Sequence, residues 1–93
     1  MASIKNFKKD LHYLTNELAS ECLFTLFIHP ETNEDVINQI AFDGVKLRDE
    51  IIKRIANRDG RKNPKLVKEG FKQLGKDMVE GFDNLFDKLA KAK

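Results

Sequence analysis

The sequence predicts an all-α fold, an up-down-up antiparallel three-helix bundle with long helices. Three stretches carry apolar residues at steps of three and four, the spacing that places side chains on one face of a helix. Two breaks that contain proline, at His29-Pro30 and between Asn57 and Pro64, separate these stretches. Five Gly and two Pro among 93 residues are too few turn residues for a many-stranded β fold. We expect a single helical domain over residues 1–93, because compact domains usually hold about 100–150 residues.

The first helix is expected over residues 4–28. Its apolar stripe keeps to one side of the helix and consists of Ile4, Phe7, Leu11, Leu14, Leu18 and Cys22. From Cys22 to Ile28 the sequence is apolar on nearly all sides, so we expect other helices or a second chain to enclose that end. Pro30 ends the helix, because proline disfavours helical conformation at the residue before it.

The second helix is expected over residues 33–56. Thr32 is the predicted N-cap, and Asp35 follows three positions later, as in a weak capping box. The apolar positions cover close to half of the circumference: Ile37, Ile40, Ala41, Gly44, Val45, Leu47, Ile51, Ile52 and Ile55. So wide an apolar face predicts contact with two neighbours, which makes this helix the central element.

The third helix is expected over residues 64–90, because Pro64 suits the first helical position. Its apolar face comprises Leu66, Val67, Phe71, Leu74, Met78, Phe82, Leu85 and Leu89. Glycine in a helix interior costs about 1 kcal/mol relative to alanine. We expect the four glycines within helices to mark close approach of neighbouring helices, the alternative being a locally loosened helix: Gly44, Gly70, Gly75 and Gly81.

The sequence contains no pattern of residues that predicts catalysis. His12 and His29 lie far apart and form no His-x-x-x-His pair, and no Glu-x-x-His motif is present. Cys22 lies on the apolar stripe, where a thiol usually acts as a small hydrophobic group. The acidic ligands of a calcium loop are missing around Gly60. We therefore expect no enzymatic activity, no catalytic residue, no metal and no cofactor.

Charge and cysteine content indicate a cytoplasmic protein. Seventeen Lys and Arg against 15 Asp and Glu give a net charge of +2, too balanced for a dedicated nucleic-acid tail. A single Cys excludes an internal disulfide and suits a reducing compartment. No run of about 18 apolar residues predicts a transmembrane segment. The first nine residues mix apolar and charged side chains and lack the core of a signal peptide.

A basic corner surrounds the second break and contains Arg54, Arg58, Arg61, Lys62, Lys65 and Lys68. Such a cluster can bind the phosphates of a nucleic acid or an anionic lipid head group, so a nucleic-acid-associated protein is the alternative function. The corner has no interleaved aromatic residues for base stacking. Arg54 and Arg58 also lie near a helix C-terminus, where positive charge is favoured in any protein. Nucleic acid is therefore not the expected partner.

The leading hypothesis is a non-enzymatic protein–protein interaction module that self-associates. Phe24 and Phe27 lie in the segment that is apolar on nearly all sides, and Phe42 lies off the stripe of its own helix. If the helices are antiparallel, Phe42 joins these residues in one patch, which predicts a homodimer through Phe24, Phe27 and Phe42 with Tyr13 at the rim. In the competing interpretation, these aromatic residues close one end of a monomeric bundle.

A third hypothesis is a small enzyme or ligand carrier with a site inside the bundle. The apolar faces carry no paired polar groups, which argues against such a site.

The opening segment reads SIKNFKKDLHYL from Ser3 to Leu14. It resembles the start of a group of small, uncharacterised bacterial helical proteins of unknown function. The resemblance covers about the first third of the chain and includes no catalytic motif. It implies a bacterial, cytoplasmic protein without an assigned activity, and it transfers no functional residues to this chain.

Overall fold

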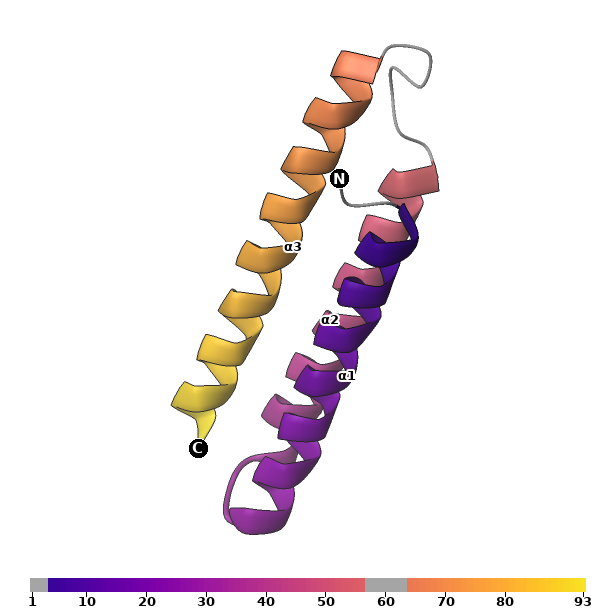
Figure 1. The fold of residues 1–93 in the computed structure, drawn as a ribbon. Coiled ribbons are helices and arrows are strands. Elements are labelled where there is room, and N and C mark those ends of the chain that lie inside the picture. Colours follow the sequence, from indigo (N-terminus) through magenta and orange to yellow (C-terminus); the bar gives the residue numbers. More distant parts are fainter. Residues whose placement is uncertain (1–3, 57–63) are drawn as a thin grey trace.

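The computed structural model describes the backbone of residues 4–56 and 64–93, and the side chains of 6–56 and 68–93. It consists of three α-helices: α1 (Ile4–Ile28), α2 (Glu34–Ala56) and α3 (Pro64–Ala92) (Figure 1). The described backbone contains no β-strand. The predicted all-α fold of three long helices is confirmed.

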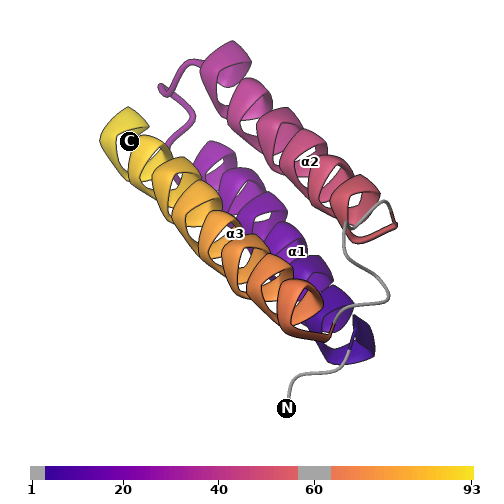
Figure 2. The same ribbon diagram turned by 90° about the horizontal axis from the view of Figure 1, so that it is seen from above.

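The three helices lie side by side along one long axis. α1 and α3 run in the same direction and α2 runs in the opposite direction (Figures 1 and 2). Each helix contacts both of the others, so the elements form a bundle 52 Å long and 17 Å across in both other directions. No helix among the described residues is sufficiently long and apolar to cross a lipid bilayer.

The turn between α1 and α2 places Asn33, not Thr32, at the N-cap of α2. The Thr32 N–H donates to the carbonyl oxygen of His29 at 2.9 Å, which closes a tight turn. Asn33 Oδ1 then accepts hydrogen bonds from the N–H groups of Asp35 at 2.9 Å and Val36 at 3.4 Å. Asn is among the most effective N-cap residues, because its short side chain reaches the free N–H groups of the first turn. The prediction of Thr32 as the N-cap is therefore wrong.

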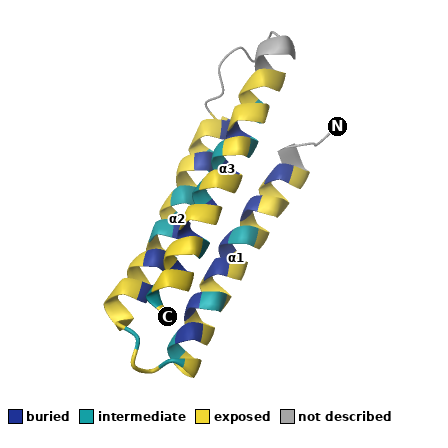
Figure 3. Cartoon of the chain, turned by 90° about the vertical axis from the view of Figure 1, so that its left-hand side faces the viewer, coloured by how far each residue is buried: buried dark blue, intermediate teal, exposed yellow. Residues whose placement is uncertain are grey.

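The buried side chains form one continuous core along the inner faces of the helices (Figure 3). Leu11 and Ile37 are completely buried, and Phe82 is the largest of the fully buried side chains. Two threonines, Thr15 and Thr25, also belong to the buried face of α1. Each hydroxyl donates to the backbone carbonyl oxygen four residues earlier at 2.8 Å, so burial leaves neither one without a partner.

Two glycines allow the helices to approach closely. A Cβ at Gly44 would lie 2.6 Å from Leu18 Cδ2 of α1, and a Cβ at Gly81 would lie 2.6 Å from Leu47 Cδ2 of α2. Real Cβ atoms essentially never approach so closely. The expectation of close packing is confirmed at these two positions: Gly44 marks the contact of α2 with α1, and Gly81 the contact of α3 with α2.

The other two helical glycines differ from this pair. Gly75 lies close to Phe7, whose ring packs edge to face on Phe71 of α3 with centroids 5.9 Å apart. A Cβ at Gly75 would make ordinary contact with Phe7 at 3.9 Å, and a Cβ at Gly70 would have no atom within 4 Å. Close packing therefore does not explain Gly70, which lies on the exposed side of α3.

α3 extends to Ala92, two residues beyond its predicted end. Lys91 Nζ lies 2.9 Å from Asp87 Oδ2, one helical turn earlier. Cations near a helix C-terminus interact favourably with the last carbonyl groups, and a pair at this spacing supports the final turn.

Candidate protein–protein interface

The outer face of α1 carries exposed aromatic side chains. Four residues of this face each lie two positions after a buried core residue: Tyr13 after Leu11, Ser20 after Leu18, Phe24 after Cys22 and Phe27 after Thr25. Residues two positions apart lie about 160° apart around a helix, so these four point away from the core. Tyr13 is 64% exposed, Phe24 60% and Phe27 82%. We call these four residues the outer α1 stripe.

The corresponding faces of the other helices are polar. On α3, the residues two positions after buried ones are Lys76, Glu80, Asn84, Asp87 and Lys91, all exposed. On α2 they are Gln39, Phe42, Lys46 and Lys53, of which one is aromatic. Apart from Phe42, these outward positions of α2 and α3 carry charged or amide residues, and α1 departs from that pattern.

Phe42 does not belong to the outer α1 stripe. Gly44 faces Leu18 of α1. Phe42 lies two positions before Gly44 on the same helix, so its side chain points about 160° away from that contact. Its ring is more than half exposed, and the Lys46 ammonium lies 5.8 Å from the ring centroid. The structure therefore places Phe42 on the outer face of α2, separate from Phe24 and Phe27.

More apolar surface is exposed at the end of α1 and in the first turn of α2. Leu23 is 70% exposed, and Ile28 and Val36 expose close to half of their surface. In this segment of α1 the bundle buries Cys22 and Thr25 and leaves Leu23 in solvent beside the stripe. Three helices therefore enclose only one side of the segment that is apolar on nearly all sides.

The structure describes only part of the basic corner. Arg58, Arg61 and Lys62 lie outside the described residues, and so does the side chain of Lys65. Arg54 Nη1 forms an ion pair with Asp77 Oδ2 at 2.8 Å, which links the end of α2 to α3. The hydrogen bonds from Arg54 and then Gln73 hold the pKa of Asp77 below its usual value. Arg54 thus has an intramolecular partner, whereas Lys68 is exposed.

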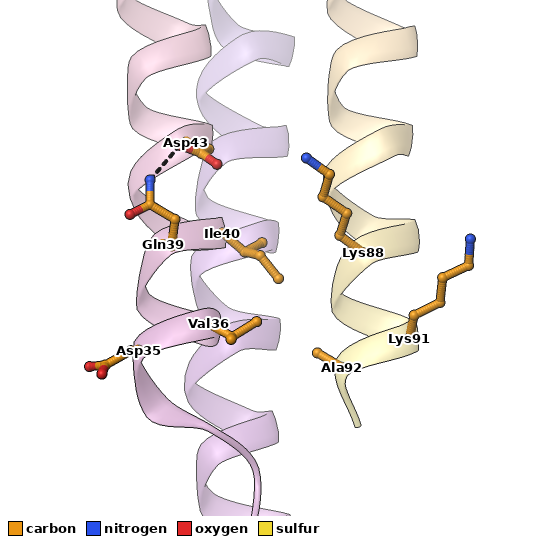
Figure 4. Close-up of a pocket in the computed structure, with 8 residues that line it drawn as sticks. All are labelled: Asp35, Val36, Gln39, Ile40, Asp43, Lys88, Lys91 and Ala92. Carbon is orange, nitrogen blue, oxygen red and sulfur yellow. Dashed lines mark hydrogen bonds between the residues drawn. The ribbon is translucent and has the colours of Figure 1, made fainter.

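An open groove of about 580 Å³ lies between the start of α2 and the end of α3 (Figure 4). Val36, Ile40 and Ala92 form its apolar part, and charged or amide side chains make up the rest: Asp35, Gln39, Asp43, Lys88 and Lys91. Figure 4 shows the Gln39 amide directed at Asp43, to which it donates a hydrogen bond of 2.9 Å. The acidic groups belong to α2 and the lysines to α3.

The single cysteine lies in the core. Burial, and secondarily the neighbouring Glu21 carboxylate, raises the pKa of the Cys22 thiol. The thiol therefore remains protonated, and a thiol is a far weaker nucleophile than a thiolate. Among the described residues, no three His, Cys, Asp or Glu side chains are grouped as metal ligands.

No protein-family model matches the chain, and no curated protein or solved structure matches it either. Within the described part of the chain, the outer α1 stripe is the surface feature that departs most from an ordinary solvated helix.

Proposed function

We propose that the protein is a non-enzymatic helical interaction module that self-associates, with the outer α1 stripe binding the same stripe of a second copy. The exposure of three aromatic side chains along one helix face is the observation that supports this proposal. Contiguous apolar patches larger than a few hundred Å² are rare on soluble monomers, and the largest patch on a protein is often a functional one. Most soluble homo-oligomers are two-fold dimers, in which one patch meets itself.

The exposed area suits a small dimer interface. At about 150–250 Å² for each aromatic side chain, the exposed parts of Tyr13, Phe24 and Phe27 amount to ~400 Å². Leu23, beside them, adds on the order of 100 Å². Two copies together therefore bury about 1,000 Å², close to the lower limit of specific protein–protein interfaces.

The charges beside the stripe favour a protein partner over an anionic one. Between Tyr13 and Phe27 the charged residues are Glu17 and Glu21, and no Lys or Arg occurs. Helices that lie on membranes carry Lys and Arg beside their apolar face, and nucleic-acid interfaces are basic. These carboxylates disfavour both kinds of surface along the stripe itself, and Lys9 lies one turn before it, so a second protein chain fits this face better.

The oligomeric state tests the proposal directly. Light scattering on the parent protein at tens of micromolar is expected to give twice the chain mass of 10.7 kDa. In a Phe24→Glu/Phe27→Glu variant, dimerisation would bury unpaired carboxylates, so the mass is expected to fall to that of one chain. Val79→Glu is the matched control, because it replaces a half-exposed apolar residue of α3 by the same charge.

Each outcome bears on the proposal. A mass of one chain for the parent protein would contradict it, and retention of that monomer on anionic vesicles would assign the α1 face to a membrane instead. A dimer that survives Phe24→Glu/Phe27→Glu would place the interface elsewhere. Phe42→Glu separates the faces of α1 and α2, because a dimer lost only in this variant would use the outer face of α2.

A further inference from the structure

On the basis of the proposed self-association, we infer that the two α1 helices pack antiparallel about a two-fold axis that passes beside Ser20. The inference concerns the arrangement of the partner and adds to the claim of a dimer. It follows from the spacing of the outer α1 stripe and from the charges at its two ends.

Two aromatic residues of the stripe are placed symmetrically about the small Ser20, and the third, Phe24, lies at the level of the partner's Asn16. Tyr13 precedes Ser20 by seven residues and Phe27 follows it by seven, so all three lie within about 40° of one another on the outer face. In an antiparallel pair centred on Ser20, each Tyr13 lies at the level of the partner's Phe27. The small Ser20 side chain at the centre lets the two backbones approach, as small residues do within this bundle at Gly44.

The seven-residue spacing also fits a pair of long helices. Residues seven apart drift by about 20° per heptad around a straight α-helix, and a left-handed crossing of the two helices compensates for the drift. Helices crossed in this way stay in contact over several turns. Phe27 lies 14 positions after Tyr13, or about 21 Å along the helix, so this crossing keeps both aromatic ends in the interface.

Charges at the ends of α1 distinguish the antiparallel from the parallel arrangement. Lys9 precedes Ser20 by 11 residues, and Glu31, in the turn after α1, follows it by 11. Both side chains are exposed, and the Glu31 carboxylate lies 3.4 Å from Nδ1 of His29. The antiparallel pair carries each Lys9 just past the end of the partner's α1 at Ile28, toward the turn that contains Glu31. A parallel pair would instead bring Lys9 to the partner's Lys9 and Glu17 to the partner's Glu17, which is unfavourable.

Disulfide cross-linking tests the position of the axis. In a Cys22→Ala background, Ser20→Cys is expected to form a covalent dimer under mild oxidation, because a disulfide needs Cα atoms about 4.4–6.8 Å apart. Asn16→Cys is the matched control on the same face, four residues from the axis. Its partner lies about 12 Å away along the helix, at ~1.5 Å per residue, so we expect at least a tenfold lower yield.

The outcomes separate this inference from the proposed function. If light scattering gives a dimer but Asn16→Cys cross-links as well as Ser20→Cys, the antiparallel register is wrong although self-association stands. The same conclusion follows if neither variant cross-links in a protein of dimeric mass. A parent protein with the mass of one chain would contradict both.

A charge exchange provides a second, independent measurement. Lys9→Glu places two like-charged pairs across the proposed interface and is expected to raise the dimer dissociation constant by about 2- to 30-fold. Adding Glu31→Lys restores opposite charges and is expected to recover most of the affinity. If the loss of dimer affinity in the double variant equals the sum of the losses in the two single variants, Lys9 does not face the partner's Glu31.

Discussion

Gly44→Ala measures directly how closely α1 and α2 approach. The added methyl group would lie 2.6 Å from Leu18 Cδ2 and 3.8 Å from Phe82 Cε1. Leu18 and Phe82 are each 1% exposed, and protein interiors are close-packed, so the end of the Leu18 side chain has to shift within a filled core. Overpacking a well-filled core costs about 1–3 kcal/mol. The gain in helix propensity offsets about 1 kcal/mol of this, so we expect a net loss of up to about 2 kcal/mol.

Gly70→Ala is the matched control for the same chemical change. A Cβ at Gly70 has no atom within 4 Å, so the substitution adds the propensity gain without a clash. We expect the free energy of unfolding to rise by about 1 kcal/mol. In a domain of this size, 1 kcal/mol corresponds to about 4–8 °C in the unfolding midpoint. The unfolding midpoint of Gly44→Ala should therefore lie below that of the parent, and the midpoint of Gly70→Ala above it.

Thermal and urea unfolding, followed by circular dichroism at one protein concentration, measure both variants. A fixed concentration is needed because self-association would add to the apparent stability. The free energy of unfolding falls linearly with urea concentration. If this slope is the same in both variants as in the parent, the substitutions change the stability and leave the unfolding transition itself unaltered. If Gly44→Ala raised the midpoint as much as Gly70→Ala, the close contact between Gly44 and Leu18 would not exist in solution.

Two further predictions follow from ionisable groups. The lowered pKa of Asp77 means that its pairing with Arg54 adds stability above the unfolded pKa of about 3.9, which is lost as the pH falls through the folded value. Asp77→Asn should therefore flatten the acid side of a plot of urea midpoint against pH, and an unchanged plot would refute the pairing. Cys22 should react with a thiol reagent about 10³-fold or more slowly in the folded protein than in denaturant, because access requires an opening of about 5 kcal/mol. Fast labelling of the folded protein would show that the core opens there.

The sequence predicted the helices well, because helix periodicity and helix ends depend on neighbours along the chain. The predicted bounds of the first helix, residues 4–28, agree with α1, and Pro64 begins α3 as its fixed φ angle favours. The error at the start of α2 arose from two adjacent cap residues. Thr32 and Asn33 both suit an N-cap, and the hydrogen bonds from the N–H groups of Asp35 and Val36 to Asn33 Oδ1 decide between them.

Part of the candidate interface was also predictable. The segment from Cys22 to Ile28 is apolar on nearly all sides, and three helices can cover only its inner side, so the exposure of Phe24 and Phe27 follows from the sequence. The apolar pattern did not predict the burial of Thr15 and Thr25, because threonine has a polar hydroxyl, although both residues lie three or four positions from core residues. Their hydroxyls donate to helix carbonyls, so a core accepts them at little cost.

By itself, the sequence determined that three amphipathic helices form, where their breaks lie, and which face of each is apolar. Only the tertiary structure decided that Phe42 points away from α1, that Arg54 pairs with Asp77, and that Gly44 but not Gly70 marks a close contact. The physical reason is that periodicity describes a helix around its own axis. Which neighbour each face meets, and at what level along the bundle, depends on how complete side chains of all three helices fit together.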